Sequence, residues 1–229
     1  MIPRMNRGYA KARRICVALG FAIWLAWLSA CSRGSAIQKL DKTKVDVNAN
    51  AQLRTDTIGT GRFTGRATYV LVDAINETGH DAAITLGGVL VDKAGVKVSD
   101  LRPESLTIPK GDKRTFALID NENAERPAAV GASVVVRSAI VPLPSSVEVT
   151  QQRTYDDFGK LVIDGWIQNK AHRAGKVIVL ATFYDADERP LKRPFTLLGL
   201  GADATRSVQF VGPPGAARAV IYLGEQVWD

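Results

Sequence analysis

Two histidines are the residues of this sequence best suited to bind a metal ion or to move a proton. His80 follows Asn76 by four positions, and His172 follows Asn169 by three. A zinc site needs three or four ligands in one place, but the histidines fall in different halves of the chain, with no cysteine near either. We therefore predict no metal site and interpret both histidines as solvated loop residues.

Carboxylates gather in two short stretches. In "YDADERP", Asp185, Asp187 and Glu188 superficially resemble a calcium loop, but the twelve-residue pattern of alternating ligands with a closing glutamate is missing. We expect an ordinary hairpin turn in which Asp185 bonds the backbone ahead of it. Asp156 and Asp157 in "TYDDFG" are likewise expected in a turn rather than as a catalytic acid pair.

Nucleophilic or phosphate-binding motifs are not evident. No G-x-S-x-G sequence stands between a strand and a helix, and "GTGRFTG" at 59–65 precedes a strand instead of opening a helix that could bind an anion,. We therefore predict a non-enzymatic protein without a cofactor. Hydrolytic activity is kept as a third hypothesis, which generic esterase, phosphatase and glycosidase substrates would test.

A cysteine marks the end of the amino-terminal segment. Residues 1–14 carry five basic side chains and no acid, and residues 15–30 carry no charge. Sixteen residues are short for a transmembrane helix, which needs about 20, so the segment has the pattern of a secretory signal. It closes on "LSAC", in which the small Ser29 and Ala30 precede Cys31.

This "LSAC" sequence resembles the lipobox of bacterial lipoproteins. The resemblance implies cleavage between Ala30 and Cys31, after a signal peptide at 1–30, and attachment of a diacylglyceryl group to the Cys31 sulfur. Several acyl chains would hold the protein stably on a lipid bilayer. Ser32 at the second mature position suggests the outer membrane of a diderm cell, facing the periplasm. The alternative is an uncleaved signal anchor with Cys31 as a small buried side chain.

Removal of this segment changes what the composition indicates. The formal charge of +7 includes the five basic residues of the signal, and 25 basic and 23 acidic residues remain, about +2. A nucleic-acid partner is therefore not expected. Cys16 is lost with the signal and Cys31 is lipidated, which leaves no thiol for a disulfide, so the fold must be stable through its core.

From residue 63 onward the sequence is typical of short β-strands. Runs such as "RATYVLVDAIN" and "ASVVVRSAIV" are rich in β-branched residues and are separated by Gly, Pro, Asn and Asp,. This pattern predicts an all-β fold of antiparallel sandwiches. Residues 31–59 hold few large apolar side chains, and we expect the lipidated cysteine and a flexible tether there, in which "TKVDVNA" could supply a short first strand.

The second half of the chain repeats the first. Asn76 aligns with Asn169 and Asp92 with Asp185, both 93 residues apart. A near-repeat of this length indicates two whole domains rather than solenoid units.

We expect the first domain at 60–142 and the second at 147–229. The stretch "VPLPSS" at 141–146 is the expected hinge, because its two prolines restrict the chain,. Contacts between domains of one chain tend to be small, so relative motion is the default expectation.

The second copy resembles the FxLYD-type immunoglobulin-like domain of secreted and lipid-anchored bacterial proteins. The resemblance rests on "IDGWIQNKAHRAGKVIVLATFYDADERPL", where an Asn-containing turn is followed by a strand that closes on aromatic-Tyr-Asp. "ATFYD" at 181–185 departs from the family motif by one spacing residue, and the first copy has "VLVD" at 89–92, without a tyrosine. The resemblance implies two tandem immunoglobulin-like sandwiches and an envelope setting, but no chemistry.

Aromatic residues crowd the second copy, and most are expected in its core. Trp228, next to the last residue, would either cap the open end of the domain or serve as an exposed interaction anchor. Our first hypothesis is a lipid-anchored interaction or scaffold protein that docks an envelope protein through a strand edge or the groove between domains. The alternative is a cell-wall or glycan-binding lipoprotein, with Trp228 or Tyr184 stacking on sugar rings.

Overall fold

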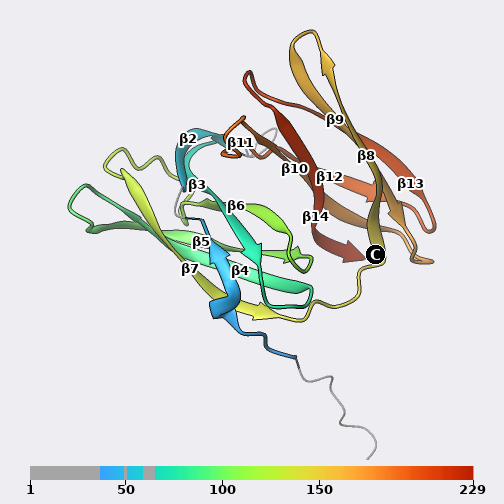
Figure 1. Cartoon of the computed structure of the whole chain (residues 1–229), viewed down its shortest axis with the longest axis horizontal. Coiled ribbons are helices and arrows are strands. Elements are labelled where there is room, and N and C mark those ends of the chain that lie inside the picture. Colours follow the sequence, from blue (N-terminus) through green and yellow to red (C-terminus); the bar gives the residue numbers. More distant parts are fainter. Residues whose placement is uncertain (1–36, 49–50, 59–64, 229) are drawn as a thin grey trace, which may run out of the picture. The chain divides into compact units, whose positions relative to one another are not determined.

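The chain folds into antiparallel β-sheets (Figure 1). The computed structural model describes residues 37–48, 51–58 and 65–228, and Gln38–Asp229 form one compact unit. Apart from one 3-10 turn, η1 (Lys42–Lys44), its elements are strands. The prediction of an all-β fold is therefore confirmed.

The amino-terminal predictions fall outside the described residues. They concern the signal peptide at 1–30, its cleavage site after Ala30 and the lipidation of Cys31. In the described part of the chain, no helix has the length and hydropathy needed to cross a membrane.

The first half of the unit is a sandwich of two sheets. One has the order β1-β3-β2, with β6 on the opposite edge of β3, and the other has the order β5-β4-β7. Because β1 and β2 pair with successive parts of one edge of β3, they act as a single interrupted strand. The strands are β1 (Val45–Val47), β2 (Gln52–Ile58), β3 (Gly65–Asn76), β4 (Ala82–Val91), β5 (Lys97–Ile108), β6 (Lys113–Ile119) and β7 (Gly131–Ile140).

The second half repeats this plan. One sheet has the order β13-β9-β8, and in the other β10 pairs with β14 on one edge and with β11 and β12 on the other. The strands are β8 (Val147–Asp157), β9 (Lys160–Asn169), β10 (Gly175–Tyr184), β11 (Pro190–Lys192), β12 (Phe195–Leu200), β13 (Thr205–Val211) and β14 (Arg218–Trp228).

Equivalent turns in the two halves use the same side chains in the same way. The buried Asn76 side-chain amide donates to the carbonyls of His80 and Ile108, both at 2.8 Å. In the second half, the buried Asn169 amide donates to the carbonyls of Arg173, at 2.9 Å, and Gly201, at 2.8 Å. Asn76 thus links the turn between β3 and β4 to a neighbouring loop, and Asn169 does the same for the turn between β9 and β10. The sequence repeat is therefore also a structural one.

The turn aspartates repeat as well. Asp92 Oδ1 accepts from the backbone N–H groups of residues 94 and 96, and Asp185 Oδ1 accepts from those of residues 187 and 189, all at 2.9 Å. This arrangement confirms the interpretation of "YDADERP" as a hairpin turn. The hairpin between β8 and β9 is closed similarly, by Asp156 Oδ1 and the N–H of Gly159 at 3.0 Å.

Strand β10 explains why the two halves form one unit. Its near-continuous apolar run is buried on both faces, as in sheets covered on two sides. Val177, Val179, Ala181 and Phe183 face the core of the second half, whereas Leu180, from the other face, belongs to the core of the first half. The two cores therefore lie on opposite faces of the same sheet.

The expected flexible tether at 31–59 is wrong for its described carboxyl-terminal part. Residues 45–47 and 52–58 form β1 and β2 and pair with β3. Val45 is buried in the core of the first half, and Leu53 packs against that core. Few apolar residues suffice in β1 and β2 because these strands pair with one edge of β3 and cover only one side of the first sandwich. The first sandwich therefore begins before residue 60.

The hinge expectation at 141–146 is also not what the structure shows. Ser145 Oγ donates to the carbonyl of Val147 at 2.6 Å, and the Gln226 side-chain amide donates to the same Oγ at 2.7 Å. The carboxyl-terminal end of the connection is thus bonded to the second half, whereas at its other end the N–H of Val141 donates to the Gln38 carbonyl at 2.9 Å. Together with the shared sheet, this argues against free motion between two separate domains.

Candidate functional site

The surface where the two halves meet, here called the junction, is formed by one face of the β10 and β14 strands against β5 and β6. Thr115 of β6 is at its centre. Its hydroxyl bonds the buried Asp73 carboxylate and the Tyr184 hydroxyl, the latter at 2.8 Å. The Tyr222 hydroxyl donates to the Thr115 carbonyl at 2.7 Å and lies 2.8 Å from the Thr182 hydroxyl. Hydroxyl groups from both halves therefore form hydrogen bonds with one another in a site shielded from water.

Charged side chains surround this buried network. Glu188 accepts two hydrogen bonds from Arg218, at 2.7 and 2.6 Å, and one from Lys113 at 3.1 Å. Lys113 and Arg218 also lie over the Tyr184 ring, 4.7 and 4.1 Å from its centroid. The hydrogen bonds from Arg218, and then from Lys113, lower the pKa of Glu188 to about 2.

Burial acts in the opposite direction on the groups inside the junction. Desolvation raises the pKa of Asp73, although its hydrogen bond from Thr115 and the nearby Lys113 oppose the rise. Desolvation also raises the pKa of Tyr184 far above its usual value. Tyr184 therefore stays protonated at neutral pH and serves as a hydrogen-bonding group of the junction.

Tyr184 cannot be the sugar-stacking residue that the sequence suggested. Its side chain is 1% exposed, and charged groups of both halves lie over its ring. The sequence did not reveal this because the first half, which covers the ring, is far away along the chain. The aromatic end of β10 is part of the junction.

Trp228 is half-buried at the end of β14. Its side chain packs against the core of the second half, and the Arg173 guanidinium lies 4.9 Å from its ring centroid. A Cβ atom on Gly175 would come within 2.6 Å of the indole, so the ring closes directly over that glycine. This is the arrangement that the capping alternative predicts.

The two histidines lie at different places. His80 lines a cleft between the halves, and its carbonyl serves the Asn76 turn. His172 is exposed, and its Nδ1 lies 2.9 Å from Asp203 Oδ2, which raises the pKa of the imidazole through the hydrogen bond and the negative charge. Among the described residues, no group of three or more His, Cys, Asp or Glu side chains could hold a metal ion.

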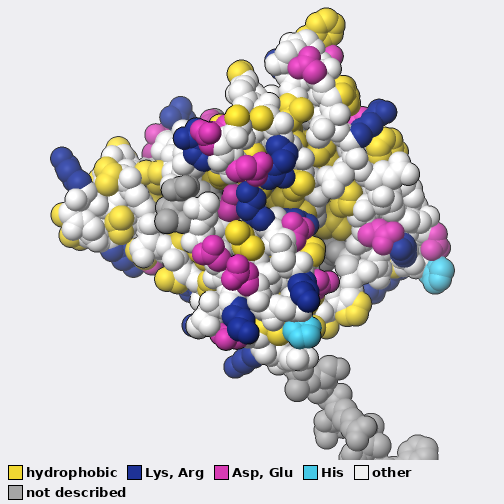
Figure 2. Space-filling model, in the orientation of Figure 1, with side chains coloured by type: hydrophobic (Ala, Val, Ile, Leu, Met, Phe, Trp, Pro, Cys, Tyr) yellow, Lys and Arg dark blue, Asp and Glu magenta, His cyan; other side chains and the backbone are white. Residues whose placement is uncertain are grey.

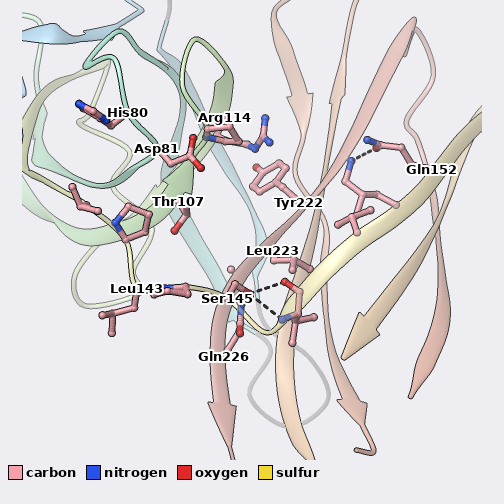
Figure 3. A pocket seen from close by; sticks show the side chains of 18 of the residues that line it. His80, Asp81, Thr107, Arg114, Leu143, Ser145, Gln152, Tyr222, Leu223 and Gln226 are labelled. Carbon is pink, nitrogen blue, oxygen red and sulfur yellow. Dashed lines mark hydrogen bonds between the residues drawn. The ribbon is translucent and has the colours of Figure 1, made fainter. Parts of the chain in front are cut away.

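The cleft that includes His80 lies at the junction and has a volume of about 740 Å³. Its first wall carries His80, Asp81, Thr107 and Arg114, and Gln152 of β8 stands on the opposite wall (Figure 3). Residues 221–224 of β14 form part of its lining, and residues 141–145 of the connection close one end. Figure 2 shows hydrophobic side chains gathered in this hollow, between rims that carry charge. The cleft therefore has an apolar interior and a polar border.

Strand β14 presents an edge without a strand partner to this cleft. In the described chain, β14 pairs with β10 alone. On the other side, the backbone N–H of Ile221 donates to the side-chain oxygen of Gln152 at 3.0 Å. Because side chains and backbone groups alternate along a strand, the N–H of Leu223 also faces away from β10.

Sequence reasoning missed both Gln152 and the β14 edge. A glutamine in a polar strand carries no motif, and β14 resembles any other apolar strand. Only the order of the strands in the sheet reveals that nothing pairs with β14 on its outer side. By contrast, the sequence repeat had already led us to expect two domains with a groove between them.

Comparisons with known proteins give little beyond this geometry. No family model matches the chain, and no curated protein matches it. Three of the solved structures that match the chain illustrate how weak the similarity is. A DUF1425 family member from Shewanella sp. pv-4 has 23% identity and a TM-score of 0.33 over 34% of this chain and 77% of its own. Red sea bream transglutaminase has 13% identity and a TM-score of 0.24 over 75% of this chain and 28% of its own. The tandem CBM22 domains of a Paenibacillus barcinonensis protein have 6% identity and a TM-score of 0.15, over 83% and 91% of the two chains.

Proposed function

We propose that this protein is a non-enzymatic, lipid-anchored module of the bacterial cell envelope that binds an extended segment of a partner protein in the cleft, along β14. The partner segment would add a strand to the β14 edge, a mode of recognition in which backbone hydrogen bonds supply much of the affinity. The anchor is the lipidated Cys31 inferred from "LSAC". It would hold the module on a bilayer, on this interpretation the outer membrane.

One observation carries the proposal. The Gln152 side chain places an amide oxygen on the N–H of Ile221, the position that a backbone carbonyl of an added strand would take. Gln152 is exposed and ends on a flexible side chain, so an incoming strand can displace it. The displaced Gln152 amide would then form hydrogen bonds with water instead of with Ile221.

The shape and lining of the cleft fit an extended peptide. Its volume is within the range of about 300–1,000 Å³ found for ligand pockets,. Leu143 is 88% exposed in the connection at one end, and Val149 of β8 lies in the wall. A segment with apolar side chains at alternate positions could bury one row of them against these residues while its backbone pairs with β14.

The glycan-binding alternative has less support from the described geometry. Tyr184 is buried, and Trp228 is packed under Arg173 and against the core. Glutamine side chains at positions 38, 152 and 226 of the cleft could still bond sugar hydroxyls. The alternative is therefore kept as an outcome of the test.

The test is crosslinking in intact cells with a photoreactive residue in place of Leu143. Leu223→Pro removes the outward N–H of β14, and proline is tolerated on an edge strand. Leu223→Ala is the matched control, because it shortens the same side chain but keeps the N–H. We expect one protein partner that is captured by the parent and by Leu223→Ala, with at least about tenfold less capture by Leu223→Pro.

Two results would contradict the proposal. Equal capture by the proline and alanine variants would show that the β14 edge is not used. Capture of glycan, together with quenching of tryptophan emission by cell-wall fragments, would favour the alternative. Both variants must first show the thermal unfolding midpoint of a folded protein.

A further inference from the structure

A second cavity lies elsewhere on the junction and shares no lining residue with the cleft. It lies where β2, β3 and β5 meet the segment that joins β11 to β12, and its volume is about 490 Å³. Among its described lining residues, three are cations, Arg102, Lys192 and Arg193, and one is a carboxylate, Asp56. The cavity therefore has a surplus of positive charge.

Arg193 is the buried part of this site. Its side chain is 7% exposed, and its Nη2 donates to Glu104 Oε1 at 2.7 Å. The second oxygen of Glu104 accepts from the backbone N–H of Ala117, also at 2.7 Å. The Nε and Nη1 atoms of Arg193 are buried and make no hydrogen bond of good geometry, although, against the opposing effect of burial, the Glu104 carboxylate and the Tyr222 hydroxyl lie close enough to raise the pKa of Arg193. An unsatisfied donor on a buried charged group is costly, so an added acceptor beside this guanidinium would be stabilising.

Further donors line the same cavity. The Lys192 ammonium and the Tyr69 hydroxyl make no hydrogen bond with any described residue. Burial, more than the nearby Asp56, raises the pKa of Tyr69, so its hydroxyl remains a donor at neutral pH. Arg102 is held at the border by the Asn123 side-chain oxygen, at 2.9 Å.

The rest of the lining is apolar. Ala117 and Ile119 of β6 and Ile58 of β2 contribute aliphatic surface, and Phe195 at the start of β12 is 48% exposed. An apolar surface next to convergent donors is typical of sites for small organic ligands. Asp56 limits the negative charge that the site can accept and favours a monoanion over a phosphate dianion.

We propose that this cavity binds a small monocarboxylate with an apolar body. The carboxylate would accept hydrogen bonds from Arg193, Lys192 and Tyr69, and the body would lie against Ile119 and Phe195. Charge-assisted bonds of this kind are about twice as strong as neutral ones. The site is separate from the peptide cleft, so it does not depend on the proposed function.

The test uses the full chain in lipid nanodiscs and two fluorinated probes of equal shape, 4-fluorophenylacetate and its neutral amide, 4-fluorophenylacetamide. Ligand-observed fluorine NMR measures the affinity of each probe. Arg102→Gln combined with Lys192→Gln removes two exposed cations of the cavity without touching the core. Lys160→Gln combined with Lys176→Gln is the matched control, because it removes two exposed cations outside every cavity described above.

We expect the carboxylate to bind, the amide to bind at least about tenfold more weakly, and the affinity for the carboxylate to fall by a similar factor in the cavity variant but not in the control. Added salt should weaken this binding. The proposal is overturned if the amide binds as well as the carboxylate, if neither probe binds at millimolar concentration, or if the two double variants lose affinity equally.

Discussion

The two halves of this protein follow one strand plan but treat the same edge differently. In the first half, the end of β7 is paired by residues 38–40: Leu40 donates to the Ala139 carbonyl at 2.8 Å, and Val141 donates to the Gln38 carbonyl at 2.9 Å. In the second half, the equivalent strand β14 has no strand partner on this side within the described chain, and the N–H of Ile221 bonds the side chain of Gln152 instead. One half thus uses its own chain to cover the end of this edge, whereas in the other half no strand of the described chain pairs with it.

The difference has a simple chemical origin. In both halves the segment that precedes the first strand passes near this edge, at 38–40 in one and at 141–146 in the other. The second segment contains Pro142 and Pro144, which have no N–H to donate to a neighbouring strand. The two prolines therefore cannot donate to β14 in the way that the N–H of Leu40 donates to the end of β7,.

The largest predicted effect concerns a loop that is longer in the first half, at 120–130, than at the equivalent place in the second, at 212–217. Between β6 and β7, Asp120 accepts hydrogen bonds from Arg126 Nε at 2.9 Å and from the backbone N–H groups of residues 122 and 124, at 3.1 and 3.0 Å. Its side chain is fully buried. Asp120→Asn removes the buried one of the two ionic partners of Arg126 and leaves only the exposed Glu122, and we expect a loss of about 3 kcal/mol of unfolding free energy in denaturant titrations. A change below about 0.5 kcal/mol would show that the loop does not stabilise this half.

The same carboxylate predicts a dependence on pH. Burial opposes its ionisation, but the hydrogen bonds from Arg126 and Ser99 outweigh burial and lower the pKa of Asp120 to about 2. The native state therefore binds this proton less readily than the unfolded chain. The stabilisation is present above the unfolded pKa of about 3.9 and is lost as the pH falls toward 2. Asp120→Asn should flatten the stability profile in that window.

A smaller effect tests the equivalence of the two halves. Asn76→Ala and Asn169→Ala each remove a buried side-chain amide that donates to two backbone carbonyls, and we expect each to cost about 2 kcal/mol. Asn121→Ala, which changes an exposed asparagine, should cost less than about 0.5 kcal/mol,. Urea unfolding of the three variants measures these values. A large loss of unfolding free energy for only one of the two variants, Asn76→Ala or Asn169→Ala, would show that the two turns are not equivalent.

The smallest effect concerns the charged rim of the junction. Glu188→Gln removes the ionic partner of Arg218 and Lys113, but the Glu188 side chain is 52% exposed, so we expect a loss below about 1 kcal/mol at neutral pH. Because the pKa of Glu188 is lowered to about 2, its contribution is present above its usual pKa, near 4.3, and disappears as the pH falls toward 2. Parent and variant should therefore converge in stability near pH 2. If the difference in stability between parent and variant stayed constant with pH, the effect would come from packing and not from the charge of Glu188.

The fold could be read from local patterns, whereas the junction could not. Alternating β-branched runs and turn residues predicted the strands, and the spacing of Asn76 and Asn169 predicted the repeat, because both signals are local or periodic. The short strand at 45–47 was foreseen as an option in "TKVDVNA", but the strand at 52–58 was missed, since its few apolar side chains indicate a strand only when β3 offers an edge to pair with. Tyr184 was misjudged because the groups that bury it come from the other half.

The sequence by itself determined the class of fold, the duplication and the turn chemistry, because hydrophobic alternation and the conformational preferences of Gly, Pro, Asn and Asp act within a few residues. Tertiary structure alone decided that one sheet would serve two cores, that the Asp73, Thr115 and Tyr184 side chains would meet, and that β14 would pair with β10 but with no second strand of the described chain. These features depend on which surfaces remain uncovered after the strands have paired. No stretch of the chain specifies that outcome alone, because it arises from contacts between residues distant in the sequence.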